Sequence, residues 1–207
     1  LGTPKPLLKI KDLTLLDHCI NLIINLNIKK IIINSFYLKE QINEFVKNHN
    51  YNIEIKVVED GESILDTGGG VLNLIDKSKE DNFLIFNPDT IWSKDNTSEI
   101  NQMISLYFTK KLDNMLLLVN RDLSFDKKLR GDFGLENNLI NKNQKNYIYT
   151  GCQILNKSIL KNEKIINFSI TKIWFNLIKN KQLNGFESKL KFCHVTNLEI
   201  FKKLRDL

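Results

Sequence analysis

Phe83–Trp92 reads FLIFNPDTIW, and this stretch decides the fold. Its first four residues are all apolar, which is typical of a strand buried on both faces of a sheet. Asp89 follows that strand, and open α/β sheets bind ligands at the carboxyl ends of their strands. A carboxylate placed there offers oxygen to a hard cation such as Mg²⁺. The alternative is an ordinary turn or capping aspartate after a strand.

Strand and helix patterns alternate along the rest of the chain. Apolar, β-branched runs occur at Lys30–Asn34, Ile53–Val58, Met115–Val119 and Tyr147–Leu155. Helix-like segments with one apolar face lie between these runs and after the last of them. This alternation predicts a three-layer, Rossmann-like α/β fold with a mostly parallel mixed sheet.

Three runs are continuously apolar and should be buried on both faces of the sheet: Ile31–Ile33, Leu84–Phe86 and Leu116–Val119. Ser124–Lys145 differs, since it is charged and rich in asparagine. We expect it to leave the sheet and form short strands around a substrate. No internal repeat or Pro/Gly-rich linker divides the chain, so residues 1–207 are expected to form a single domain.

The composition is ordinary for a soluble globular protein. The 207 residues are 42% hydrophobic and 26% charged, enough to bury a core without disulfide or metal staples. Polar residues interrupt the longest apolar candidate, Leu13–Leu26, so no membrane span is expected. No secretory signal is visible, and three cysteines without paired spacing favour a reducing compartment. We therefore expect a cytoplasmic protein.

The net charge of +6 favours an anionic partner. The lysines are spread over the whole chain, and no groove-reading or base-stacking motif accompanies them. An anionic small substrate accounts for the sign of the charge, and no nucleic-acid partner is expected.

Leu65–Gly70 reads LDTGGG and is expected to join a strand to a helix beginning near Val71. Glycine lets another group approach the backbone closely, and the first turn of a helix has free N–H groups. The loop could therefore bind an anion or a polar base at the positive end of the helix dipole. The alternative is a tight strand-to-helix turn with no ligand.

Thr3–Leu8 reads TPKPLL and holds one lysine between two prolines. Proline fixes φ and restricts the residue before it, so the backbone of Lys5 should be extended and stiff. A stiff lysine suits a phosphate site, where it acts as a compact point charge. The same segment could simply be a linker into the first helix.

In their order and separation, these three segments resemble the sugar-1-phosphate nucleotidyltransferase family. The similarity runs from Thr3 to the C-terminus and is greatest to the mannose-1-phosphate guanylyltransferase-like and N-acetylmuramate-1-phosphate uridylyltransferase-like branch. Further matching pieces are Lys29–Asn34 followed by Tyr37-Leu38, Gly131–Gly134, and Tyr149–Gly151. The resemblance implies a nucleotidyltransferase fold and the reaction of a nucleoside triphosphate (NTP) with a sugar 1-phosphate to give a nucleoside diphosphate (NDP) sugar and pyrophosphate.

The resemblance also implies residue roles. Lys5 would contact the nucleotide phosphates and pyrophosphate, and Asp89 would hold Mg²⁺ between the nucleotide and the sugar phosphate. The nucleobase would lie against Leu65, Asp66, Thr67, Gly68 and Gly69. The sugar pocket would be lined by Gly131, Asp132, Gly134, Thr150 and Gly151. Positioning and charge neutralisation are what such a reaction between two anions requires, so no protein nucleophile is needed.

The sequence departs from the family pattern at its start. Family members open with a buried strand and a Gly-rich loop that wraps the phosphates, whereas only Leu1-Gly2 precede Thr3 here. We expect that strand and loop to be missing upstream. Without them, nucleotide binding should be weak and turnover small.

A second departure lies near the end of the chain. The family often has a second metal-binding aspartate where this sequence has His194 in the stretch Phe192–Glu199. Imidazole suits transition metals better than Mg²⁺. Asp89 could therefore hold the metal with substrate phosphates and water alone, or His194 could be a second ligand. It could instead donate to a phosphate, or lie at a strand end without any catalytic part.

Two other functions remain open. One is a non-catalytic regulatory protein that binds a nucleotide sugar. The other is cytidylyl transfer to a phosphorylated alcohol such as phosphocholine, for which Phe133, Tyr147 and Tyr149 could form an aromatic cage. The base, the sugar and the oligomeric state are not fixed by these motifs.

Overall fold

The structure, a computed structural model, describes residues 2–207. Its strands are β1 (Lys9–Ile10), β2 (Leu13–Thr14), β3 (Lys30–Ser35), β4 (Glu54–Glu59), β5 (Asn82–Phe86), β6 (Asn114–Asn120), β7 (Gly134–Glu136), β8 (Leu139–Asn141), β9 (Tyr147–Asn156) and β10 (Gly185–Ser188). Its α-helices are α1 (Leu15–Ile24), α2 (Lys39–Asn48), α3 (Asp66–Asp76), α4 (Asn96–Thr109), α5 (Thr171–Lys179) and α6 (Leu198–Arg205). Short 3-10 helices are η1 (Lys5–Leu7), η2 (Arg121–Leu123) and η3 (Lys157–Leu160). Each predicted apolar run coincides with a strand, namely β3, β4, β5, β6 or β9.

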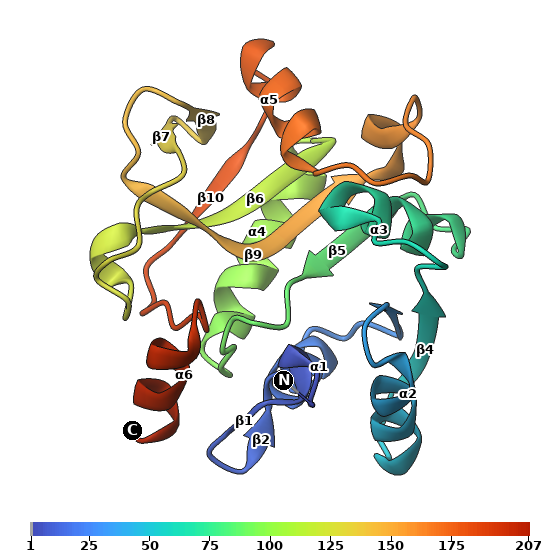
Figure 1. Cartoon of the computed structure of the whole chain (residues 1–207). Coiled ribbons are helices and arrows are strands. Elements are labelled where there is room, and N and C mark those ends of the chain that lie inside the picture. The colour runs from blue at the N-terminus through green and yellow to red at the C-terminus, as the bar shows by residue number, and fades with distance from the viewer. Residues whose placement is uncertain (1) are drawn as a thin grey trace.

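A four-stranded sheet in the order β10-β6-β9-β5 crosses the middle of the molecule (Figure 1). β10 and β6 are parallel, whereas β9 is antiparallel to both β6 and β5. Three strands therefore run in one direction and β9 runs in the other. β3 and β4 form a separate parallel pair beside α2. The α/β fold with a mixed, mostly parallel sheet is confirmed.

Two apolar clusters, one on each face of the central sheet, make the three layers. On one face, α1 and α4 pack on sheet residues that include Leu117 and Ile154. On the other face, α3 and α5 pack on Leu116, Leu118 and Leu155. Because successive residues of a strand point to opposite faces, the continuous apolar run of β6 supplies both clusters. Every helix within residues 2–207 is too short or too polar to cross a lipid bilayer.

Burial differs among the three runs that were expected to be covered on both faces. Leu116–Val119 in β6 is almost completely buried, as predicted. Leu84–Phe86 in β5 is only half-buried, and within Ile31–Ile33 of β3 only Ile31 is buried. Among residues 2–207, β5 pairs with β9 alone and β3 with β4 alone, so no strand of the described chain lies on the other edge of either. The expectation of full burial was therefore wrong for these two strands.

The excursion expected over Ser124–Lys145 forms the small hairpin of β7 and β8. Asn137 and Asn138 make its two-residue turn with φ values of 50° and 62°. Asparagine tolerates this left-handed backbone better than most residues, which explains a tight hairpin at an asparagine pair. The hairpin lies beside β10 and above the N-terminal end of β9 in Figure 1.

Candidate functional site

Asp89 lies in the loop after β5, and contacts with β9 hold that loop in place. The Asn87 N–H donates to the Gly151 carbonyl at 2.7 Å, and the Thr90 hydroxyl donates to the Thr150 carbonyl at 2.7 Å. Gly151 has a φ of +90°, and a Cβ at this position would lie 2.9 Å from Asn87 Cβ. Glycine accommodates both the left-handed backbone and the close approach. The antiparallel neighbour of β5 therefore fixes the position of Asp89.

The segment around His194 runs antiparallel to the Asp89 loop. Thr90 and His194 face each other in an isolated bridge, although they are 104 residues apart in sequence. Two backbone hydrogen bonds of 2.9 Å flank this pair, one from Ile91 to Cys193 and one from Val195 to Asp89. The bridge explains how the end of the chain reaches the carboxyl end of β5.

Lys5, Asp89 and His194 meet at this point. The Lys5 ammonium lies 2.8 Å from Asp89 Oδ2, and His194 Nδ1 lies 3.6 Å from Asp89 Oδ1. The Lys5 side chain is 42% exposed, and those of Asp89 and His194 are 25% exposed. The structure thus brings together the sequence-predicted lysine, carboxylate and imidazole in a partly open site.

The charge state of His194 follows from its surroundings. Burial lowers its pKa below the usual 6.5, although the Asp89 carboxylate acts in the opposite sense. The imidazole is therefore neutral at neutral pH, and its 3.6 Å separation from Asp89 Oδ1 is not an ion pair. A neutral imidazole keeps a lone pair on one ring nitrogen.

Asp89 Oδ1 is buried and accepts no hydrogen bond within the described chain. Buried carboxylate oxygens usually have a partner, and a divalent cation is a suitable one. This orphaned oxygen is the observation that makes the residues fit a metal. Across residues 2–207, no three His, Cys, Asp or Glu side chains converge on one point. Asp89 and His194 are therefore the protein ligands that this site offers.

The backbone of Lys5 differs from the predicted extended conformation. Lys5 begins the 3-10 helix η1, with Pro4 before it in an extended conformation (φ −60°, ψ 142°). Hydrogen bonds from Leu7 to Pro4 and from Leu8 to Lys5 close the turn at 2.9 Å and 3.1 Å. The expectation of an extended Lys5 was wrong because these local bonds outweigh the preference that a following proline imposes.

The three glycines of Leu65–Gly70 lie inside α3, which begins at Asp66 rather than near Val71. The N–H groups of Gly68 and Gly69 both donate to the Phe168 carbonyl, at 2.9 Å and 3.2 Å. A Cβ on Gly68 would overlap the Phe168 ring, and one on Gly69 would overlap the Ile166 carbonyl oxygen. These glycines therefore allow the segment 164–169 to pack on the helix. The predicted helix start near Val71 was wrong, and two N–H groups of the first turn of α3 are bonded to the Phe168 carbonyl instead of being free for a ligand.

Other parts of the same stretch remain accessible. Asp66 and Thr67 are exposed, whereas Leu65 and the glycines are buried. Asp66 has a left-handed backbone with φ 57°, and the Thr67 hydroxyl accepts the Ile170 N–H at 3.1 Å. Among the described contacts, the Thr67 side chain is hydrogen-bonded to another segment, whereas the exposed Asp66 side chain bonds only within its own stretch.

The predicted sugar-pocket residues fall into two groups. Gly131 and Gly134 pack so closely on the segment 144–146 that a Cβ on Gly131 would overlap the Lys145 carbonyl oxygen. Thr150 is buried, and its hydroxyl donates to the Leu117 carbonyl at 2.9 Å. Gly151 supports the Asp89 loop. These four residues therefore shape the backbone instead of offering side chains.

Asp132 is the member of this set with an exposed, charged side chain. Its carboxylate accepts the Tyr149 N–H at 2.9 Å. Burial raises its pKa above the usual 3.8, while the Tyr149 hydrogen bond and the nearby charge of Lys145 act in the opposite sense.

The aromatic residues considered for a cage do not form one. Phe133 is buried, and its ring lies edge-on to Trp174 at 6.2 Å. The Tyr149 ring packs on the same indole at 4.8 Å. Both rings therefore belong to the core under α5, where a quaternary amine would not reach them.

Two supports of His194 were not predicted from the sequence. The Phe192 ring stacks parallel to the imidazole at 5.7 Å. Upstream, Glu99 of α4 accepts hydrogen bonds from the Ser188 hydroxyl at 2.6 Å and from the Lys189 N–H at 2.8 Å. The two Glu99 contacts join residues 89 and 90 positions apart, so no local pattern indicates them.

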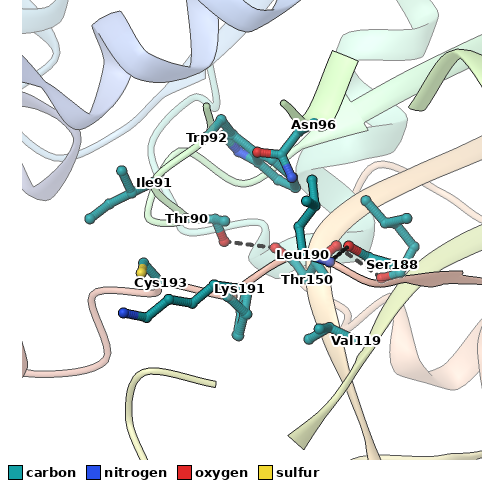
Figure 2. Close-up of a pocket in the computed structure, with 12 residues that line it drawn as sticks. Thr90, Ile91, Trp92, Asn96, Val119, Thr150, Ser188, Leu190, Lys191 and Cys193 are labelled. Carbon is teal, nitrogen blue, oxygen red and sulfur yellow. Dashed lines mark hydrogen bonds between the residues drawn. The ribbon is translucent and has the colours of Figure 1, made fainter. Parts of the chain in front are cut away.

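A small cavity of about 10 Å³ lies behind the Asp89 loop (Figure 2). It is lined by residues of the loop and of its supports, among them Thr90, Trp92, Thr150, Ser188, Lys191 and Cys193. Its volume is close to that of one water molecule. It is therefore a gap in the packing that supports the loop, too small for a nucleotide or a sugar.

The family model described as "Nucleotidyl transferase" matches residues 1–122. This match covers more than half of the 207 residues and includes Lys5, Leu65–Gly70 and Asp89. The chain belongs to the nucleotidyl transferase family and is an enzyme of that class, which confirms the predicted resemblance. No curated protein matches the sequence.

Solved structures of several nucleotidyltransferases have a similar fold. HddC from Yersinia pseudotuberculosis complexed with GMP-PN has a TM-score of 0.79 at 19% identity, covering 99% of this chain and 89% of that one. The inositol-1-phosphate CTP transferase from T. maritima has a TM-score of 0.76 at 16% identity, covering 98% and 86%. A putative glucose-1-phosphate thymidylyltransferase from Bacillus anthracis has a TM-score of 0.78 at 14% identity, covering 99% and 86%. At these identities the likeness establishes the fold.

Proposed function

We propose that this protein transfers a nucleotidyl group from an NTP to a sugar 1-phosphate and releases pyrophosphate. The observation that carries the proposal is the contact of Lys5 with Asp89 Oδ2 at the carboxyl end of β5, beside Asp89 Oδ1, which accepts no hydrogen bond from residues 2–207. A cation and a carboxylate brought together there by distant segments suit a reaction between two phosphates. The named activities of the similar structures, on glucose 1-phosphate and inositol 1-phosphate, support the same reaction class.

In the reaction, a phosphate oxygen of the sugar 1-phosphate attacks the α-phosphorus of the NTP in line with the leaving group. A new P–O bond forms, and the bond between the α-phosphorus and the bridging oxygen breaks. That oxygen leaves with pyrophosphate and keeps the electron pair. The Lys5 ammonium would neutralise charge on the phosphates, which lowers the repulsion between the two anions. Positioning by the fixed Asp89 loop supplies the rest.

A divalent cation, proposed to be Mg²⁺, would be held by Asp89 with His194 as a second candidate ligand. When bound, such a cation supplies Lewis-acid charge stabilisation at the phosphate oxygens. The buried and unpartnered Asp89 Oδ1 supports this assignment.

We assign the nucleotide to Lys5 and Leu65–Gly69, with Asp66 and Thr67 as the accessible side chains. The sugar is assigned to the side of the site formed by Gly131, Asp132, Gly134, Thr150 and Gly151. Within that group, the Asp132 carboxylate is the side chain available to a sugar hydroxyl. The protein is proposed to act in the cytoplasm without a nucleic-acid or membrane partner, as one domain over residues 1–207.

The test is pyrophosphate release by the purified full-length protein over a panel of NTPs and phosphorylated acceptors with Mg²⁺. Asp89→Asn should lower kcat/KM by about 10²-fold or more, and His194→Asn should lower it less. Asp76→Asn is the matched control, since Asp76 is an exposed aspartate at the far end of α3. Silence over the whole panel with retained NDP-sugar binding would replace the proposal with a regulatory protein. Turnover of phosphorylated alcohols alone would replace the acceptor.

A further inference from the structure

The backbone of the stretch Leu65–Gly69 is bonded to another part of the chain. The N–H groups of Gly68 and Gly69 donate to the Phe168 carbonyl at 2.9 Å and 3.2 Å, and the Leu65 carbonyl accepts the Phe168 N–H at 3.1 Å. Groups that are paired in this way do not bind a ligand without first losing a hydrogen bond. A nucleobase that lies against this stretch therefore depends on a side chain for recognition of its edge.

Asp66 has a side chain that can recognise a base. It is exposed, and within residues 2–207 its carboxylate makes one hydrogen bond, accepting the Thr67 N–H on Oδ1 at 2.6 Å. A carboxylate has about four lone-pair sites, so both oxygens can accept further donors. The negative charge of Asp66 also offsets the positive end of the α3 dipole, so a phosphate is not attracted there. Asp66 therefore suits a neutral ligand that has N–H groups.

Guanine is the base whose edge matches a carboxylate. Its N1–H and N2 amine are adjacent donors, whereas adenine and cytosine place an amine beside a ring nitrogen that accepts. Uracil and thymine have one N–H between two carbonyl oxygens, which a carboxylate repels. We propose that Asp66 makes this protein select a guanine nucleotide, by accepting the N1–H on one carboxylate oxygen and the N2 amine on the other. This inference rests on the proposed function, which places the base against Leu65–Gly69.

Two exposed isoleucines lie on the segments around Asp66. The Ile64 side chain is 59% exposed and that of Ile166 is 58% exposed. The Asn167 amide donates to the Ile64 carbonyl at 2.8 Å, which joins the two segments. The second segment also lies against the start of α3, since a Cβ on Gly69 would overlap the Ile166 carbonyl oxygen. These apolar side chains supply a surface for the face of a purine ring, while Asp66 binds its edge.

The backbone at Asp66 allows a conservative test of this role. Asp66 is in the left-handed region, with φ 57°. Asparagine adopts this conformation as readily as aspartate does, so Asp66→Asn should preserve the shape of the loop. The substitution replaces one acceptor oxygen by an amine donor, which opposes the N2 amine of guanine.

The experiment measures the binding of GDP, UDP, CDP, dTDP and ADP to the full-length protein by isothermal titration calorimetry. The wild type should bind GDP on the order of tenfold more tightly than the other four. Inosine diphosphate (IDP), which lacks the N2 amine, should bind more weakly than GDP to the wild type and about as tightly as GDP to Asp66→Asn. Xanthosine diphosphate (XDP) has an oxygen in place of the N2 amine, so Asp66→Asn should bind XDP more tightly than the wild type does.

Glu62→Gln is the matched control, because Glu62 is an exposed carboxylate in the same loop. It should retain the GDP preference of the wild type. Equal affinities of the wild type for the five diphosphates would overturn the proposal, and so would a GDP preference over IDP that persists in Asp66→Asn. Loss of the preference in Glu62→Gln would also contradict it, since the loop charge rather than Asp66 would then select the base. A gain in XDP affinity confirms in addition that the variant is folded.

Binding of nucleoside diphosphates needs no turnover, so the two proposals fail separately. A protein that prefers GDP through Asp66 but releases no pyrophosphate with any acceptor retains this base site and loses the proposed function. Pyrophosphate release that is equally fast with every NTP has the opposite meaning. Binding of none of the five diphosphates would overturn both.

Discussion

Strands β5 and β6 are almost equally apolar, yet the fold uses them differently. Met115–Val119 of β6 is at most 1% exposed, whereas Phe83–Phe86 of β5 is half-buried throughout. β6 has a hydrogen-bonded neighbour on both edges, β10 and β9, whereas β5 has β9 as its one neighbour within the part of the chain that the structure describes. The comparison teaches that apolar sequence predicts a strand, while the number of neighbouring strands decides how far its side chains are buried.

The two strands also have different relations to the site. β6 supplies both faces of the core and contributes no candidate ligand. β5 carries Asp89 at its end, and that end is held by hydrogen bonds to β9 and by the bridge to His194. We infer that the stability of the core depends mainly on β6, while the geometry of the site depends on what holds the end of β5.

The most direct test of the difference between β5 and β6 is to truncate one leucine in each strand. Leu117 and Leu84 contribute to the same apolar cluster, but Leu117 is completely buried and Leu84 is half-buried. Leu117→Ala should lower the free energy of unfolding by about 4 kcal/mol and Leu84→Ala by about 2 kcal/mol, because a less enclosed site loses less on truncation. Chemical denaturation of the two variants and the wild type measures both values.

Equal losses in the two variants would contradict the comparison and mean that β5 is as fully enclosed in solution as β6. A change in the denaturant slope rather than in the midpoint would instead indicate an altered unfolded or native state. The slope must therefore be compared in all three proteins before the energies are.

The strands were predictable from the sequence because buried strands leave a local signal. The runs that indicated β3, β4, β5, β6 and β9 lie within one or two residues of the observed bounds. The partial exposure of β5 left no such signal, since it depends on which strands pair with which. The antiparallel direction of β9 was likewise invisible, because a run buried on both faces looks the same in either direction.

The site was predictable in its charged residues and poorly predictable in its supports. The motifs around Lys5 and Asp89 indicated charged groups for binding phosphate and a cation, and the structure places these two side chains in contact. The glycines of α3 were predicted to bind a ligand. In the structure, the N–H groups of Gly68 and Gly69 donate to the Phe168 carbonyl, about 100 residues further along the chain. Glu99 had no signal at all, because its partners Ser188 and Lys189 follow from the tertiary fold.

A second test sharpens the role of β9 in holding the end of β5. Gly151 and Gly61 both have positive φ, at +90° and +89°, but only Gly151 has a close neighbour, Asn87 Cβ, at 2.9 Å from an added Cβ. Gly61→Ala should cost about 1 kcal/mol of stability from backbone strain alone. Gly151→Ala should cost about 2–3 kcal/mol, because the clash is added to the strain.

Pyrophosphate release measures whether the clash also moves Asp89. Gly151→Ala should lower kcat/KM, and Gly61→Ala, which has open space around the new methyl group, should leave it unchanged. The same loss of stability in both variants would show that the contact with Asn87 yields without cost, and β9 would then not be what fixes the loop.

The smallest expected effect concerns the hydrogen bonds that Asp17 accepts from Thr14 and Tyr51. Asp17 caps the start of α1 through Thr14 and accepts the Tyr51 hydroxyl at 2.6 Å, which links α1 to the segment leading into β4. Burial alone would raise the pKa of Asp17, but the hydrogen bonds from Tyr51 and Thr14 lower it below the usual 3.8. Asp17→Asn should cost about 1–2 kcal/mol at neutral pH, since hydrogen bonds to a charged group are lost.

The sign of the pH dependence follows from that lowered pKa. A carboxylate with a lowered pKa contributes its full stability above the unfolded value of about 3.8 and loses it as the pH falls through the folded value. The stability difference between wild type and Asp17→Asn should therefore be constant near neutral pH and shrink below about pH 4. Leu117→Ala, which removes no charge, should show a difference from the wild type that does not change over the same range. A difference for Asp17→Asn that is equally constant would mean that the carboxylate has no special partner in the folded state, and the link between α1 and β4 would rest on apolar contacts alone.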